Sequence, residues 1–151
     1  MIIWGLEFGH SLEIRLIRTI RLINMFLLLD PSAKDLIQLA LFDEKVTKWY
    51  ERAGRNRELL EAVDSFLTQE GFSKSSLKGI MVVVGAGSFT STRIAAVIAN
   101  VFGYVHGMPL LAVTKEQASD PQALIPALRR EPARQYISAT YSGEPNIRLQ
   151  T

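Results

Sequence analysis

The sequence of 151 residues has no cysteine and only two histidines, His10 and His106. Without cysteine the chain forms no disulfide, has no thiolate nucleophile and cannot ligate zinc through sulfur. Two distant histidines cannot supply the usual ligand set of a zinc enzyme either. An excess of charge is also missing, because 17 basic and 15 acidic residues leave a net charge of +2. So small a surplus is weak evidence for a nucleic-acid-binding protein.

Long apolar runs are absent as well. None reaches the roughly 18 residues of a membrane-spanning helix, so we expect no transmembrane segment. The opening MIIWGLEFGH lacks the basic start of a signal peptide, and Glu7 interrupts its apolar character. We therefore expect a cytoplasmic protein. The composition, 48% apolar and 21% charged, is that of an ordinary globular chain, and the length favours one domain.

Residues 1–24 differ in pattern from the rest of the chain and are interpreted as an N-terminal extension. Arg15, Arg18 and Arg21 recur at every third position among leucines and isoleucines. This spacing fits a basic amphipathic helix that binds a membrane surface or a partner. The alternative is a loose extension without a role, since Met25 opens the first clear strand. We favour the second interpretation and expect no membrane partner.

Residues 25–114 have the pattern of an α/β core domain. Three strands, a helix, a strand, a helix and a strand are expected in this order, at residues 25–30, 36–42, 45–52, 56–71, 79–85, 89–106 and 108–114. Asn56 is expected to cap the first helix and Gly71 to end it. The apolar stripe of that helix comprises Leu59, Leu60, Val63, Phe66 and Leu67. The order of elements predicts a mixed α/β sheet that begins with an antiparallel meander.

The pattern of helices and strands is weaker in residues 115–151, which are interpreted as a reduced C-terminal segment. Asp120 and Pro121 predict the start of a short helix, whose length Pro126 and Pro132 limit. The apolar residues of 135–141 predict a last strand, and a polar tail comes after it.

A glycine turn connects the strand at 79–85 with the helix at 89–106. Gly85 and Gly87 stand where a phosphate could meet the N–H groups of a helix N-terminus. A dinucleotide fingerprint, however, needs a third glycine where Thr90 stands, and no lysine completes a P-loop. The alternative is a sharp turn in which glycine allows unusual backbone angles and Ser88 or Thr90 caps the helix. We favour this second interpretation.

The helix at 89–106 is apolar on nearly all sides, so it must be buried on nearly all sides. A sheet covers only one face of such a helix. Ala96, Ala99 and Gly103 form a strip of small residues that permits the close approach of another helix. Two occupants of this strip remain open, namely another part of this chain and a partner protein.

Three segments together resemble the TsaB (YeaZ) family. The sequence GAGSFTSTR at 85–93 resembles the family signature Gly-Pro-Gly-Ser-Phe-Thr-Gly-x-Arg, which opens a long apolar helix, and GMP at 107–109 resembles the Gly-x-Pro before the next strand. LLLDPS at 27–32 resembles the opening strand and its Asp-Thr-Ser turn, and 55–67 resembles the first helix. The chain departs from the pattern at Ala86, Ser91 and Pro31, which stand for proline, glycine and threonine. The second half of the family is shortened here to residues 115–151.

The resemblance implies an actin-like, RNase H-like fold, here a single subdomain with helices on both faces of a mixed sheet. It implies a non-catalytic partner of a TsaD-like transferase that makes threonylcarbamoyladenosine in tRNA, with a TsaE-like ATPase joining them and tRNA contacted only indirectly. No cofactor, metal site or catalytic residue of its own is expected. The functional loops are expected at Gly85, Gly87, Ser88, Phe89, Thr90 and Arg93, with a first turn at Asp30 and Ser32. The partner interface is expected at Ala62, Ser65, Ala96, Ala99, Asn100 and Gly103.

Three alternatives to this role remain. In an ATPase or kinase of the actin-like fold, Asp30 would imitate a metal-proximal carboxylate, although Pro31 removes a backbone N–H from that turn. A metallopeptidase would need a His-Glu-x-x-His motif, which the sequence lacks. A self-associating module would form a homodimer without a transferase partner.

Overall fold

The computed structural model describes residues 24–139, which form one five-stranded sheet in the order β3-β2-β1-β4-β5. The strands are β1 (Phe26–Asp30), β2 (Leu36–Phe42), β3 (Thr47–Ala53), β4 (Ile80–Val83) and β5 (Leu110–Val113). The sheet is mixed, because β1 pairs antiparallel with β2 and parallel with β4. This topology confirms the α/β sheet with an antiparallel meander that the sequence predicts.

The hairpin of β2 and β3 pairs Leu39 with Tyr50 and Ala40 with Trp49. Its turn depends on Asp43, whose Oδ1 accepts the backbone N–H groups of Lys45 and Val46, each at 2.7 Å. An aspartate that bonds to the backbone two residues ahead forms a turn by itself. The hairpin is therefore tight without a glycine.

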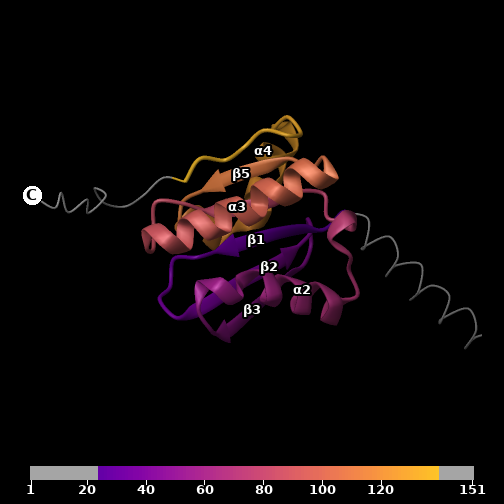
Figure 1. Cartoon of the computed structure of the whole chain (residues 1–151). Helices are drawn as coiled ribbons and strands as arrows, with labels where there is room; N and C mark the ends of the chain where they lie inside the picture. The colour runs from indigo at the N-terminus through magenta and orange to yellow at the C-terminus, as the bar shows by residue number, and fades with distance from the viewer. Residues whose placement is uncertain (1–23, 140–151) are drawn as a thin grey trace, which may run out of the picture.

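Helices cover both faces of the sheet, as the sequence predicts. The helices α2 (Leu59–Glu70) and α3 (Phe89–His106) lie on one face, and the short α4 (Ile125–Arg130) lies on the other (Figure 1). Side chains of successive strand residues point to opposite faces, so the apolar strands build two cores. Leu27 and Leu29 pack on the α2 and α3 side, whereas Phe26 and Leu28 pack on the α4 side.

The first helix differs from the prediction at its start. A short 3-10 turn, η2 (Asn56–Glu58), precedes α2, and Arg55 rather than Asn56 occupies its N-cap position. The side chain of Asn56 instead donates a hydrogen bond to Ser91 Oγ at 2.5 Å. Leu60 is exposed, because it lies about 100° around the helix from Leu59 and away from the sheet. The end of the helix is as predicted, since Gly71 adopts a left-handed conformation with φ 79°.

Two further expectations concern the ends of the chain. No strand forms at 135–139, so the predicted last strand is wrong over its described part. The extension at 1–24, with its arginine repeat, lies outside the described residues apart from Asn24. Within residues 24–139, no helix is long and apolar enough to span a membrane.

Candidate functional site

The glycine turn after β4 packs directly against the turn after β1. Gly87 has φ 89°, and a Cβ atom added there would lie 2.6 Å from the carbonyl oxygen of Pro31 and 2.9 Å from Ser32 Cα. Gly85 has φ 76°, but a Cβ atom there would meet nothing within 4 Å. Positive φ values favour glycine at both positions, and close backbone contact requires it at Gly87. Gly87 therefore serves the backbone geometry, as the sequence predicts.

A hydroxyl network holds the start of α3. Ser88 is the N-cap, and its Oγ accepts the backbone N–H of Ser91 at 3.1 Å. The Ser91 hydroxyl lies 2.6 Å from Ser88 Oγ and also accepts the Asn56 amide. Ser91 thus connects the start of α3 to η2, the turn that precedes α2. The remaining loop residues Phe89, Thr90 and Arg93 are exposed.

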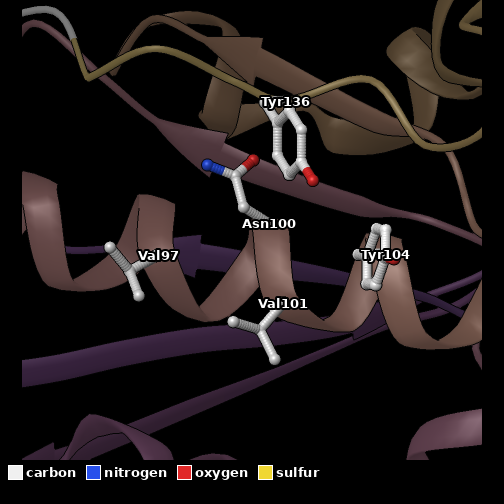
Figure 2. Close-up of a pocket in the computed structure, with 5 residues that line it drawn as sticks. All are labelled: Val97, Asn100, Val101, Tyr104 and Tyr136. Atoms are coloured by element: carbon white, nitrogen blue, oxygen red, sulfur yellow. The ribbon is translucent and has the colours of Figure 1, made fainter.

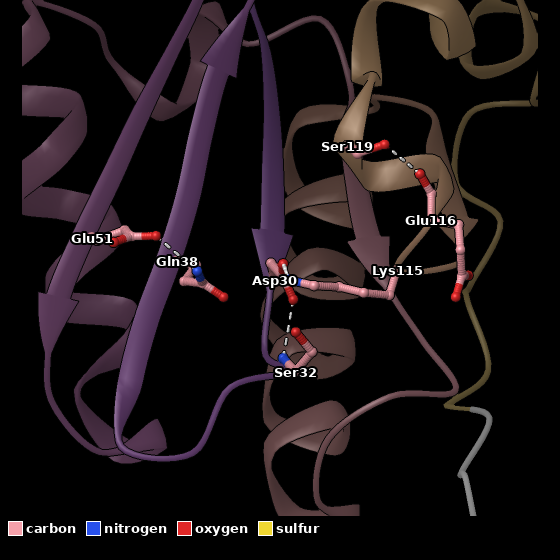
Figure 3. Close-up of polar contacts among 7 residues, drawn as sticks. All are labelled: Asp30, Ser32, Gln38, Glu51, Lys115, Glu116 and Ser119. Carbon is pink, nitrogen blue, oxygen red and sulfur yellow. Dashed lines mark hydrogen bonds and ion pairs between the residues drawn. The ribbon is translucent and has the colours of Figure 1, made fainter.

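The first turn carries a buried carboxylate that is already paired. Asp30 is only 5% exposed, and its Oδ1 accepts the backbone N–H of Ser32 at 3.0 Å. Its Oδ2 forms an ion pair with the ammonium group of Lys115 (Figure 3). Lys115 lies just after β5, and the carboxyl ends of the parallel strands β1, β4 and β5 meet at one edge of the sheet. That adjacency makes the pair deducible in principle, yet sequence reasoning did not identify Lys115.

At this edge of the sheet, the negative charge of Asp30 is therefore balanced by the positive charge of Lys115 from the same chain. The Lys115 ammonium group lies beside Asp30 Oδ2, the position that a bound metal ion would take. Over residues 24–139, no group of three or more histidine, aspartate or glutamate residues lies together in a way that could hold a metal.

The strip of small residues on α3 faces inward, which corrects the expected interface. Ala99 is fully buried, Ala96 is nearly so, and both pack within the chain's own sheet and helices. A Cβ atom added to Gly103 would lie 2.9 Å from Leu110 Cδ1 on β5. Ala62 on α2 is likewise fully buried, whereas Ser65 is exposed. The small residues allow α3 to approach its own sheet closely.

The opposite side of α3 is apolar and exposed. The outer face of α3, as we call it here, consists of Val97, Val101, Tyr104 and Val105, each more than half exposed. Val101 is four residues from both Val97 and Val105 and three from Tyr104, so the four positions lie along one side of the helix. Sequence reasoning missed this face, because every side of the helix is apolar and small size was taken as the mark of an interface.

A hollow of about 320 Å³ lies beside the outer face of α3, lined by Val97, Asn100, Val101, Tyr104 and Tyr136 (Figure 2). The expected interface residue Asn100 is half-buried and bonds within the chain. Its Nδ2 donates to the carbonyl oxygen of Ile137 at 3.0 Å, and its Oδ1 accepts the Ile137 N–H at 2.8 Å. Asn100 thereby fixes a C-terminal segment on α3.

Comparisons with known proteins give a family match and similar solved structures. Residues 52–140 match the model of the TsaD family, described as tRNA N6-adenosine threonylcarbamoyltransferase. The crystal structure of an uncharacterized Pseudomonas aeruginosa protein with similarity to peptidase YeaZ is 25% identical, with a TM-score of 0.56 over 65% of this chain and 48% of that chain. YeaZ from Pseudomonas aeruginosa is 27% identical, with a TM-score of 0.54 over 60% of this chain and 44% of that chain. The chain thus spans about half the length of these two proteins. No curated protein sequence matches it.

Proposed function

Because the chain belongs to the TsaD family and is similar to YeaZ (TsaB) over about half the length of that protein, we propose that it acts in threonylcarbamoyladenosine modification of tRNA. Its role there is that of a non-catalytic partner of a TsaD-like transferase in the cytoplasm. The partner chain carries the transfer chemistry, and a TsaE-like ATPase joins the pair. The tRNA is contacted through the partner.

The observation that carries this proposal is the outer face of α3. Its four side chains lie on one side of the helix, and each is more than half exposed. Exposed apolar side chains gathered on one surface are typical of interaction sites, including those for other proteins. Burial of such side chains against a partner helix removes apolar area from water, which is the main favourable term in association. Ser65, on the neighbouring helix α2, is exposed as well and would be a polar part of the same interface.

The ion pair of Asp30 and Lys115 favours a partner role over an ATPase role. Magnesium binding at Asp30 would require the chain to displace its own ammonium group, which is held by a carboxylate that is only 5% exposed. Pro31 moreover offers no N–H to a phosphate at this turn. The nucleotide alternative would therefore have to disrupt contacts that the fold already makes.

Co-purification tests the proposal directly. The full chain, expressed with a tagged TsaD-like protein from the same organism, is expected to elute with it as a stoichiometric complex. Titration of the chain alone with ATP and magnesium is expected to show no binding tighter than about 1 mM, or roughly −4 kcal/mol. If the chain forms a homodimer and does not bind the TsaD-like protein, the result would favour the self-associating module. Micromolar ATP binding with turnover would favour the enzyme.

A further inference from the structure

Residues 131–139, called the strap here, follow α4 through a turn at 133–134 and contact α3 at Ile137. The strap has no helix or strand, so its position depends on side-chain contacts. Asn100, in the middle of α3, holds it through both hydrogen bonds to the backbone of Ile137. An amide that pairs with both the N–H and the carbonyl of one residue imitates a neighbouring strand. This pairing fixes the position of Ile137 along α3 and the orientation of its backbone relative to the helix.

The two residues at the centre of the strap have opposite surroundings. Ile137 is partly buried and packs against the core cluster on the α3 side of the sheet. Side chains alternate in extended backbone, so Tyr136 points the other way. It is 69% exposed and lines the hollow together with Val97, Val101 and Tyr104 (Figure 2). One contact therefore buries Ile137 and places Tyr136 on the outer surface.

The hollow is continuous with the outer face of α3. Three of its lining residues, Val97, Val101 and Tyr104, are themselves members of that face. A helix that docks along α3 must consequently cover the hollow as well. Two valines, two tyrosine rings and the Asn100 amide, which is bonded to the strap, form an uncharged lining that suits one large aliphatic or aromatic side chain. Tyrosine is enriched among residues that dominate binding energy, because it offers a large rigid area and loses few rotamers.

We propose that Tyr136 is a contact residue of the partner-binding face and that Asn100 is the positioning residue that holds it there. The inference rests on the proposed function. The occupant of the hollow is an apolar side chain from a helix of the TsaD-like partner. The interface of this chain thus includes its C-terminal strap in addition to α3.

A binding titration of the full chain with the TsaD-like protein tests this inference. Tyr136→Ala is expected to weaken binding roughly tenfold, as truncation of an aromatic anchor commonly does. The melting temperature is expected to stay unchanged, because the ring is mostly exposed. Asn100→Ala is expected to weaken binding by the same factor, since the strap is released. In the Tyr136→Ala background, Asn100→Ala is expected to cause no further loss, because both changes remove one contact.

Control variants separate this inference from the function on which it rests. Val105→Glu alters the outer face of α3 outside the hollow, so it is expected to abolish binding if that face binds the partner. Failure of the unaltered chain to bind the TsaD-like protein would reject the proposed function itself, and unchanged binding by Val105→Glu would reject the outer face of α3 as the binding surface. Loss of binding by Val105→Glu with unchanged binding by Tyr136→Ala would reject only the role of the strap. Additive losses from Tyr136→Ala and Asn100→Ala would overturn the positioning role. Should Asn100→Ala not fold, Asn100→Asp replaces it, because the carboxylate keeps the acceptor for the Ile137 N–H but cannot donate to the Ile137 carbonyl oxygen and repels it.

Discussion

At the scale of single residues, the function of the glycine turn is geometric. Gly85 and Gly87 both have positive φ values, but a Cβ atom would meet another backbone segment only at Gly87. The sequence indicated both glycines, since a strand meets a helix there. The sequence did not show that Gly87 is the more constrained of the two glycines, because its contact with Pro31 joins two turns that are distant in the chain.

The two glycines provide a matched pair of variants. Gly85→Ala is expected to lower the free energy of unfolding by about 1–2 kcal/mol, the cost of a left-handed conformation for an L-residue. Gly87→Ala is expected to lower it by roughly 1–3 kcal/mol more, because the methyl group meets the Pro31 carbonyl and forces the turns apart. Urea unfolding of the two variants measures the difference. Equal losses would mean that the contact between the turns contributes nothing.

At the scale of the element, α3 illustrates the limits of a sequence pattern. Its bounds are as predicted, because Ser88 and Gly107 give clear end signals. Its orientation is opposite to the prediction, since the small residues face the sheet and the valines face outward. A helix that is apolar all round has no polar side to fix its rotation about its axis. Tertiary contacts, such as that of Gly103 with Leu110, determine which side is buried.

A pair of charge insertions checks this orientation. Ala99→Glu places an unpaired carboxylate in the core, at a cost of about 3–5 kcal/mol, which is a large part of the stability of a small domain. The variant is expected to lose its cooperative thermal transition. Val101→Glu leaves the carboxylate in water, so its melting temperature is expected to match that of the unaltered chain. The reverse result would mean that α3 is rotated about its axis, with the valines buried and the alanines outside.

At the scale of the whole molecule, the order of elements along the chain and the mixed sheet with its antiparallel meander are the best predicted properties. The spatial order of the five strands was not predicted from the sequence. Contacts between distant segments were not predicted. The pair of Asp30 and Lys115 spans 85 positions, and that of Asn100 and Ile137 spans 37. Neither pair produces a periodic pattern in the sequence, because the two partners come together only when the chain folds.

The molecule has two comparable exposed apolar positions on opposite faces of its sheet. Val101 is 51% exposed on the outer face of α3. Trp49 is 54% exposed on β3, opposite Ala40, whose side chain packs on the α4 side. A change at either position meets water in the isolated chain. Only a change at Val101 meets the partner if the proposed function is right.

The dissociation constant of the complex with the TsaD-like protein, measured calorimetrically for Val101→Glu and Trp49→Glu, tests the central claim most directly. A carboxylate buried without a partner costs roughly 3–5 kcal/mol, so Val101→Glu is expected to weaken binding more than about a hundredfold. Trp49→Glu is expected to bind as tightly as the unaltered chain. Unchanged binding by a folded Val101→Glu variant would contradict the account, because the outer face of α3 would then not be the partner-binding surface.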